Sequence, residues 1–227
     1  MNIHTIILAA GKGTRMNTNL PKVMQPLGGH TLISHVIKTA QKNSKKITVV
    51  VGHQKDLLKE HIINIDPQIQ TADQDDQLGT AHAVKMASHL IKDDEKILIL
   101  YGDVPLISSK TIEGLINSGH ECTLLTMQLN DPTGYGRVIT NGQNLALKII
   151  EQKDASEDEL KIEEVFTGIL LIDGSLLRPA LEEIKNQNSA NEYYLPDCVE
   201  LLSGKGVKIK CMQANTAEVS GANNKQE

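Results

Sequence analysis

Short aliphatic segments alternate with helical patterns through the first half of this chain, and this alternation restricts the fold more than any other feature. Segments 4–10, 46–53 and 96–107 are rich in Ile, Leu and Val, and segments 30–42 and 54–63 repeat apolar residues at helical spacing. Strands that alternate with helices are typical of a mainly parallel sheet with helices against its faces. The sequence therefore predicts an α/β fold.

The second half follows a different pattern. Segments 136–140, 145–153 and 165–173 are predicted strands joined by short connections, which favours an antiparallel or mixed portion of the sheet. Segment 154–164, between two of these strands, is dense in charged residues. We expect this segment to form a solvated loop or lid.

Capping residues predict where two of the helices begin. Thr80 is the expected N-cap of a helix that runs from about 79 to 91, and Ser108 is the expected N-cap of a helix over 108–119. Both residue types accept a hydrogen bond from the first turn of a helix.

Composition and charge exclude several classes of protein. A formal net charge of -5 over 227 residues argues against a sequence-independent nucleic-acid binder, which needs a basic face. Cys122, Cys198 and Cys211 are far apart and odd in number, so we expect free, mostly buried thiols in a reducing cytoplasm. No apolar run approaches the roughly 20 residues that span a bilayer, and the first residues lack the pattern of a signal peptide. We expect one soluble, cytosolic domain that binds neither nucleic acid nor a membrane.

A glycine-rich turn, GKGTRM, follows the first predicted strand. The backbone N–H groups of such a turn suit a phosphate, because no Cβ blocks its close approach. A dinucleotide fingerprint needs a third glycine where this chain has Met16, and a Walker A loop needs the spacing G-x-x-x-x-G-K. The turn instead carries Lys12 and Arg15, and Lys22 follows shortly after; these cations fit a polyphosphate. Taken alone, the same residues also fit an ordinary surface turn.

Asp103 follows the strongest strand signal in the chain. Ligands of open α/β sheets bind beyond the carboxyl ends of the strands, where Asp103 could hold Mg²⁺ on a bound phosphate. Because Asp-x-Pro also favours turns, Asp103 could instead begin a turn. His82 is interpreted as a structural residue or one that supports its neighbours in the site, and the His and Cys spacing predicts no zinc site.

Nine motifs occur in the order found in one known family. They are LAAGKGTRM, LPKV, QLGTAHA, LYGDVPLI, DPTGYGRV, IIEQKDA, FTGILL, NEYYLPD and EVSGANN. On these motifs the chain, from about Ile3 to Asn224, resembles the N-terminal uridylyltransferase domain of the bifunctional bacterial N-acetylglucosamine-1-phosphate uridylyltransferase and glucosamine-1-phosphate acetyltransferase (GlmU) family. The resemblance implies a Rossmann-like nucleotidyltransferase fold over residues 1–227, with a mixed, mainly parallel sheet flanked by helices and a smaller antiparallel sugar-binding portion.

The resemblance also implies an activity. The enzyme would use Mg²⁺ to transfer UMP from UTP to N-acetylglucosamine 1-phosphate, giving UDP-N-acetylglucosamine and pyrophosphate for cell-envelope precursors. Both substrates are anions, so positioning and charge neutralisation suffice and no enzyme nucleophile is needed. We expect Arg15 and Lys22 to be the catalytic residues, stabilising the transition-state charge and the departing pyrophosphate.

Site residues are carried over from the family position by position. The implied nucleotide contacts are Leu8, Ala9, Ala10, Gly11 and Lys22, with Gln74, Gly79 and Thr80 on the uracil. The implied remainder of the site is Tyr101 and Gly102 on the substrates, Gly136 and Glu151 on the amino sugar, Asp103 on the metal, and Asn223 on both metal and substrate.

The chain departs from the family where Phe166 replaces an Asn that contributes to sugar binding. The aromatic side chain lacks the amide that could hydrogen-bond the sugar. We therefore hypothesise a weaker affinity for the sugar phosphate or a preference for a different sugar. Ala81 and Ala222 are milder departures. The hexapeptide repeats of the acetyltransferase half are absent from the sequence, so we expect no acetyltransferase activity and a monomer.

Two alternatives stay open from the sequence. One is a nucleotide-binding protein that has lost turnover through Phe166. The other is a transferase that uses a different nucleoside triphosphate, as the cytidylyltransferases do, although the residues at Gln74, Gly79 and Thr80 favour uracil.

Overall fold

In the computed structural model, residues 1–13 and 20–222 are described, and nine of their strands form one sheet in the order β5-β4-β1-β6-β10-β7-β11-β9-β8. The strands are β1 (Ile3–Ala9), β4 (Lys46–Val51), β5 (Gln70–Asp73), β6 (Lys96–Tyr101), β7 (Cys122–Gln128), β8 (Arg137–Thr140), β9 (Leu145–Ile150), β10 (Glu164–Asp173) and β11 (Ile209–Gln213). A separate short hairpin joins β2 (Pro26–Leu27) and β3 (His30–Thr31).

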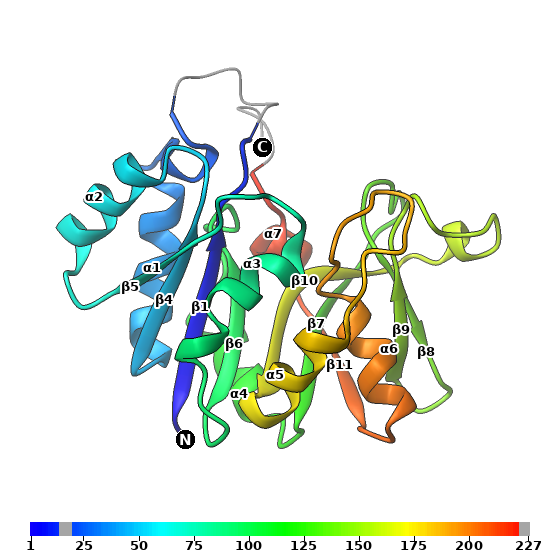
Figure 1. Cartoon of the computed structure of the whole chain (residues 1–227). Helices are drawn as coiled ribbons and strands as arrows, with labels where there is room; N and C mark the ends of the chain where they lie inside the picture. Colours follow the sequence, from blue (N-terminus) through cyan, green and yellow to red (C-terminus); the bar gives the residue numbers. More distant parts are fainter. Residues whose placement is uncertain (14–19, 223–227) are drawn as a thin grey trace.

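One half of the sheet is parallel. β1 pairs in parallel with β4 and β6, and β4 pairs in parallel with β5, so their carboxyl ends meet at the upper edge in Figure 1. Every residue of β1 is buried, as are the inner residues of β4 and β6. Strands covered on both faces are continuous apolar runs, which is why the sequence revealed them. The predicted α/β arrangement of this half is confirmed.

β10 is the strand that joins the two halves of the sheet. It runs antiparallel to β6 on one side and to β7 on the other, and its register shifts between Phe166 and Leu170. Within this irregular stretch Gly168 has a φ of +87°, and a Cβ there would collide with the ring of Tyr101. The sequence predicted 165–173 as part of an antiparallel or mixed portion, and the structure places this strand in the centre of the mixed sheet.

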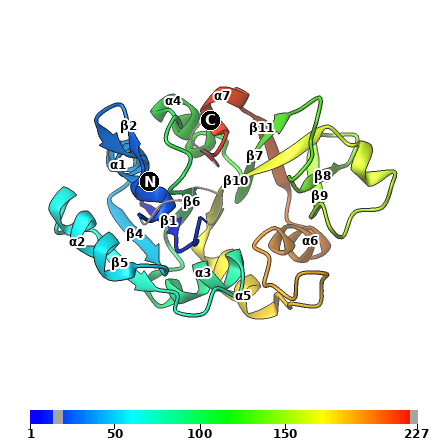
Figure 2. The same ribbon diagram turned by 90° about the horizontal axis from the view of Figure 1, so that it is seen from above.

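Helices cover both faces of the sheet, as Figure 2 shows from above. One side carries α1 (Leu32–Asn43), α2 (Lys55–Ile65), α4 (Ser109–Ile116) and α7 (Thr216–Val219), and the other carries α3 (Thr80–Met86), α5 (Gly174–Glu183) and α6 (Asp197–Gly204). Alternate residues of each strand enter opposite cores. In β1, Ile6 and Leu8 belong to the core beneath α3 and α5, whereas Ile7 and Ala9 belong to the core beneath α1 and α4.

The two capping predictions have different outcomes. Ser108 caps α4 as predicted, because its side chain accepts a hydrogen bond from Thr111 N at 3.2 Å. Thr80 is not an N-cap: Gly79 holds that position, and Thr80 is the first residue of α3. Its hydroxyl accepts instead from Leu195 N at 2.9 Å, a contact between distant segments that local sequence does not reveal. The predicted helix over 79–91 also divides, since α3 ends at Met86 and a 3-10 turn, η3 (Ser88–Leu90), follows.

The predicted solvated segment and the buried cysteines agree with the structure. The 3-10 turn η4 (Glu159–Lys161) projects at the right of Figure 1, and the side chains of Asp158 and Lys161 are 92% and 74% exposed. Cys122, Cys198 and Cys211 are free and buried, and burial raises the pKa of each thiol. A third 3-10 turn, η2 (Lys22–Met24), lies near the carboxyl end of β1.

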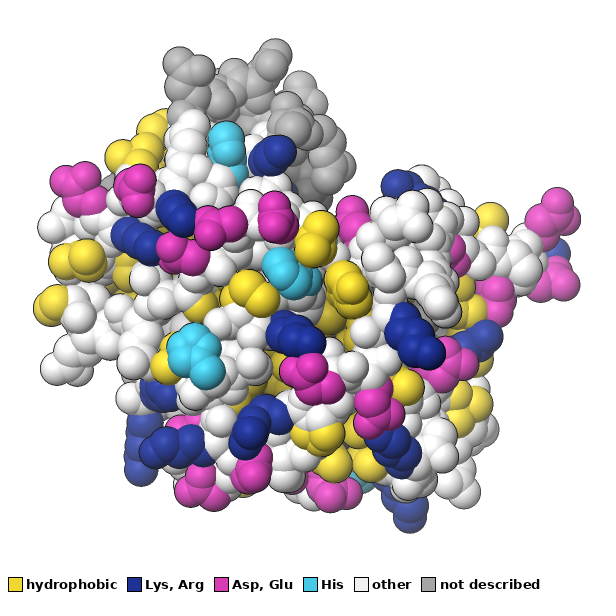
Figure 3. Space-filling model, viewed as in Figure 1, with side chains coloured by type: hydrophobic (Ala, Val, Ile, Leu, Met, Phe, Trp, Pro, Cys, Tyr) yellow, Lys and Arg dark blue, Asp and Glu magenta, His cyan; other side chains and the backbone are white. Residues whose placement is uncertain are grey.

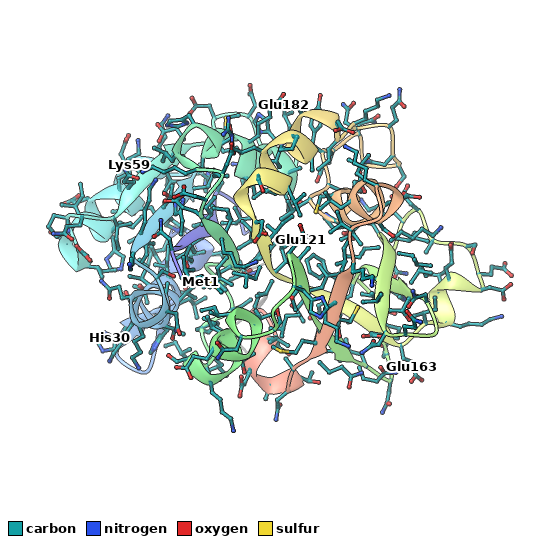
Figure 4. The ribbon with its side chains drawn as sticks, turned by 90° about the horizontal axis from the view of Figure 1, so that it is seen from below. Met1, His30, Lys59, Glu121, Glu163 and Glu182 are labelled. Atoms are coloured by element: carbon teal, nitrogen blue, oxygen red, sulfur yellow. The ribbon has the colours of Figure 1, made fainter. Side chains whose placement is uncertain are left out.

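The outer surface is mixed in charge. In Figure 3, Lys and Arg side chains lie among Asp and Glu side chains over the body of the molecule. Some pair between neighbouring elements, as Lys85 does with Glu182 at 2.6 Å. Within the described ranges, no helix combines the length and apolarity needed to cross a bilayer. Figure 4 shows the opposite end of the sheet, where Met1 and Glu121 lie just before β1 and β7.

Close packing at the start of α5 can be tested with one methyl group. A Cβ at Gly174 would overlap the carbonyl oxygen of Lys92 and lie 3.1 Å from Ile91 Cγ2, whereas a Cβ at Gly204, the last residue of α6, would meet open space. Gly174→Ala should lower the free energy of unfolding by about 1–3 kcal/mol. Gly204→Ala should leave it unchanged or raise it by up to about 1 kcal/mol, because alanine favours a helix. Urea unfolding followed by circular dichroism measures both, and equal effects would contradict this account.

Candidate functional site

A cavity of about 440 Å³ opens at the carboxyl ends of β1 and β6. It brings together residues from distant parts of the sequence. Ten predicted site residues line it: Leu8, Ala9, Ala10, Gly11, Lys22, Gln74, Gly79, Thr80, Tyr101 and Asp103. Gly13, Val23, Gln77, Ala83 and Glu192 also line the cavity, without having been predicted.

The floor of the cavity is backbone from the end of β1. Leu8 O accepts a hydrogen bond from Gly102 N at 2.9 Å, and Ala10 O accepts from Gln77 Nε2 at 3.0 Å. Gly102 does not line the cavity, because it packs directly behind it: a Cβ there would lie 3.0 Å from Val23 Cγ1 and 3.4 Å from Leu8 O. Gly102 therefore packs closely enough to let β6 and η2 approach β1, and its contact with a substrate stays a prediction.

An ion pair lies at one end of the cavity. Lys22 Nζ donates to Asp103 Oδ2, and the two side chains are only 14% and 21% exposed. Gly13 lies directly against Lys22, because a Cβ on Gly13 would collide with the Lys22 side chain. Its φ of +58° also favours glycine at this position. Asp103 O also accepts from Ala222 N at 2.9 Å, which brings the end of the described chain to Asp103. Cation and carboxylate thus neutralise each other at the place where the sequence predicted phosphate and metal.

Two predicted residues, Arg15 and Asn223, lie outside the described residues. Their roles stay predictions. Ala222, the neighbour of Asn223, is held at Asp103 as just described.

Another part of the cavity wall is built around the amide of Gln74. This side chain is buried, with 3% exposure, although it lines the cavity. Its Nε2 lies 3.0 Å from Gly79 O and 3.0 Å from His82 Nδ1. Gly79 has a φ of +115°, and a Cβ there would lie 2.5 Å from Tyr193 O, so only glycine fits. The predicted pair Gln74 and Gly79 is therefore one hydrogen-bonded unit.

Tyr101 lines the cavity and lies close enough to Glu151, a predicted sugar residue, for the charge of Glu151 to act on it. Burial, with the nearby charges of Glu151 and Asp103, raises the pKa of Tyr101 well above its usual range, and Thr80 hydrogen-bonds its hydroxyl. The hydroxyl thus stays neutral and can donate. Gly136 and Glu151 do not line the cavity. The two are neighbours, because a Cβ on Gly136 would lie 3.4 Å from Glu151 Oε1.

The sugar side of the site is acidic. Burial and the charges of Asp197, Asp154 and Glu192 raise the pKa of Glu151. Burial and the charges of Glu200 and Asp154 raise the pKa of Asp197 to about 6. Carboxylates accept hydrogen bonds from hydroxyl groups and repel phosphates. The Lys22–Asp103 ion pair and Glu192 thus line one cavity, and Glu192 is also one of the charges that act on Glu151.

The donor set at Asp103 can be compared with what metal ions require. Among residues 1–13 and 20–222, no group of three or more His, Cys, Asp or Glu side chains could hold a metal ion. Mg²⁺ commonly takes one or two carboxylates together with substrate phosphates and waters. The partly buried Asp103 carboxylate, facing a cavity that also holds Lys22, fits this type of site.

Sequence reasoning missed Gln77 and Glu192. Gln77 is the first residue of the quoted motif QLGTAHA, and Glu192 lies in NEYYLPD. Their signal was thus present in the motifs, but neither residue had an assigned role. His82 does not line the cavity, but its Nδ1 lies 3.0 Å from Nε2 of Gln74, which does. This contact is compatible with the interpretation of His82 as a residue that supports its neighbours in the site.

The raised pKa of Asp197 predicts a pH-dependent stability. The carboxyl ionises at about pH 4 in an unfolded chain and at about 6 in the folded protein, so stability from this group falls as the pH rises from about 4 through 6. Asp197→Asn should therefore raise the thermal unfolding midpoint at pH 7.5, and the gain should shrink as the pH falls toward 4.

The exposed Asp158, 92% accessible at its side chain, provides the control. Asp158→Asn should change the thermal unfolding midpoint only slightly, and by the same amount at pH 4 and at pH 7.5. A gain from Asp197→Asn that is the same at pH 4 and pH 7.5 would contradict the assignment.

Comparison with known proteins identifies the family of the chain. Residues 5–192 match the family model of the MobA-like NTP transferase domain. The bifunctional protein GlmU of Hydrogenovibrio crunogenus is 44% identical over 100% of this chain and 51% of its own length, and that of Clostridioides difficile is 42% identical over 100% and 50%. The chain thus spans about half the length of these curated relatives.

Solved structures agree on the fold. A UDP-glucose pyrophosphorylase complexed with UDP-glucose superposes with a TM-score of 0.75 at 18% identity, covering 94% of this chain and 90% of the other. At that identity the likeness concerns the fold alone, a mixed sheet flanked by helices. On the match over residues 5–192, the chain belongs to the MobA-like NTP transferase domain family.

Proposed function

We propose that this protein transfers UMP from UTP to a sugar 1-phosphate and releases pyrophosphate. N-acetylglucosamine 1-phosphate is the sugar phosphate that we favour. The observation that carries the proposal is the polarity of the site. The Lys22–Asp103 ion pair and the Gln74 amide line one 440 Å³ cavity, and the charge of Glu151, with carboxylates around it, acts on Tyr101 in the cavity wall. The similarity to GlmU proteins, at 42–44% identity, supports the same activity.

The chemistry joins two anions. An oxygen of the sugar phosphate attacks the α-phosphorus of UTP, a new P–O bond forms, and the bond from the α-phosphorus to the bridging oxygen breaks as pyrophosphate leaves. Lys22 is suited to bind the phosphates and reduce the charge that opposes this approach. Arg15, on the glycine-rich turn, is proposed to bind the leaving pyrophosphate. The reaction needs no enzyme nucleophile.

We propose Asp103 and Asn223 as the ligands of Mg²⁺. When bound, the ion would neutralise phosphate charge and polarise the α-phosphate. Lys22 pairs with Asp103 in the protein alone, and the same ammonium can turn to the phosphates once a cation occupies the carboxylate. A cytoplasmic location, where nucleoside triphosphates are abundant, is part of the same proposal.

The sugar is proposed to lie between Tyr101, Gly136 and Glu151. The neutral Tyr101 hydroxyl is a donor, and the Glu151 carboxylate is an acceptor for sugar hydroxyl or amide groups. The carboxylates near Glu151 disfavour a phosphate at this end, so the substrate would enter with its phosphate toward Lys22.

A second candidate is the same reaction with another sugar. Phe166 is only 6% exposed, and its N–H donates to Gly136 O at 2.9 Å, so the ring lies in the core beside the proposed sugar residues. An aromatic side chain here offers no hydrogen bond to an acetamido group. Because Lys22 and Asp103, which the proposal places on the phosphates and the metal, are both present in the cavity, we favour a changed sugar preference over a lost reaction.

Pyrophosphate release tests both candidates. Purified protein with Mg²⁺ is given UTP or CTP in combination with N-acetylglucosamine 1-phosphate, glucosamine 1-phosphate or glucose 1-phosphate. Release with UTP and N-acetylglucosamine 1-phosphate is expected to be fastest. Faster release with another sugar, shifted back by Phe166→Asn, would favour the second candidate, and binding of UTP without release from any pair would overturn the proposed activity.

Loss of the Lys22 ammonium should weaken catalysis without unfolding the protein. Removal of one group that stabilises transition-state charge typically costs about 10²- to 10³-fold in rate, so Lys22→Met should lower kcat/KM for UTP in that range. Lys161→Met, at an exposed cation on η4, is the matched control and should keep wild-type rates. Thermal unfolding verifies that both variants fold; a Lys22→Met protein with unchanged kcat/KM would exclude Lys22 from the mechanism.

A further inference from the structure

The hydrogen bonds of Gln74 fix the orientation of its amide. Gly79 O, 3.0 Å away, can only accept, so the amide atom facing it must be the nitrogen. The same nitrogen lies 3.0 Å from His82 Nδ1. An amide N–H can only donate, so His82 Nδ1 accepts and the neutral ring of His82 carries its proton on Nε2. Both hydrogens of the Gln74 amide are therefore bound by protein acceptors.

His82 itself does not line the cavity. It is on α3 and itself lines a second hollow of about 300 Å³, together with Leu78, Ala81, Lys85, Met86, Leu181 and Tyr193. Its ring packs near that of Tyr193, with centroids 6.4 Å apart and planes tilted by 33°. Gly79 O also accepts from Ala83 N at 3.1 Å, so the start of α3 holds both acceptors in place. His82 thus contacts Gln74 from behind and acts on a ligand only through that amide.

The Gln74 oxygen is the atom left for a ligand. Within the described residues nothing donates to Gln74 Oε1, and the side chain lines the cavity. An acceptor at this position matches a ring N–H, such as N3–H of uracil. It opposes the bare N3 of cytosine, because two acceptors cannot share a hydrogen bond.

We propose that His82 is a positioning residue that selects the base. By accepting from Gln74 Nε2, it holds the amide with its oxygen toward the cavity, and the site thereby favours a pyrimidine with a ring N–H over one with a bare ring nitrogen. The inference rests on the proposed use of UTP, because the selected base is that of the nucleotide substrate.

Two substitutions at His82 separate hydrogen bonding from packing. His82→Phe keeps a ring beside Tyr193 but loses the acceptor. His82→Asn loses the ring but keeps an oxygen close to the position of Nδ1. His82→Phe should raise KM for UTP about 3- to 10-fold, the usual effect of one lost hydrogen bond, and lower the preference for UTP over CTP by a similar factor with a smaller change in kcat. His82→Asn should retain most of the preference.

Readouts that need no turnover keep this test independent of the proposed activity. Calorimetric binding of UTP and CTP should show the same loss of preference in His82→Phe, and ¹⁵N NMR of labelled histidine should show an unprotonated Nδ1 at His82. An unchanged ratio of UTP to CTP in His82→Phe, an equal loss in both folded variants, or a protonated Nδ1 would overturn the inference. Absence of pyrophosphate release by the wild type, with preserved binding preference, would overturn only the proposed activity.

Discussion

Parallel pairing of β4, β1 and β6 is the constraint on which the rest of the site depends. Because these strands run in one direction, their carboxyl ends meet at one edge, and the backbone beyond β1 meets that beyond β6. The hydrogen bond from Gly102 N to Leu8 O fixes this meeting point at 2.9 Å. Lys22 and Asp103, 81 residues apart in the chain, then form an ion pair because the sheet has already brought their segments together. The chemistry of the site is thus a consequence of strand direction.

Local signals predicted the parallel half of the fold, whereas most of the residues that line the cavity were predicted from the family resemblance. Buried strands have continuous aliphatic sequences, and the serine that caps α4 acts on residues three positions away, so both can be recognised from neighbouring residues. The position of β10 could not be predicted in this way. Its insertion between β6 and β7 depends on pairing with strands more than 35 residues away, and alternation within the strand itself is compatible with several partners.

Thr80 illustrates why a correct residue can receive an incorrect role. Its type suits an N-cap, but Gly79 takes the cap position because Tyr193 packs directly against it and leaves no space for a Cβ. The Thr80 hydroxyl is then available to Leu195 N and to Tyr101. Tertiary contacts thus redirect a side chain that local rules assign to its own helix. Gln77 was missed for a similar reason, since its bond to Ala10 O spans 67 residues.

Hydrogen-bond accounting connects these contacts to selectivity. A cavity wall made of backbone carbonyls, as at Ala10 and Gly79, offers acceptors to any donor, so it distinguishes ligands poorly until side chains occupy those acceptors. Gln77 and Gln74 do so, each donating to one carbonyl. A ligand can then bind only the amide atoms that make no hydrogen bond within the protein. In Gln74 this atom is Oε1, because Gly79 O and His82 Nδ1 accept both hydrogens of Nε2. The Lys22 ammonium, together with the cation proposed at Asp103, is suited to hold phosphates, which all nucleotides share. Discrimination among bases depends instead on neutral groups whose donors and acceptors are fixed before the ligand arrives.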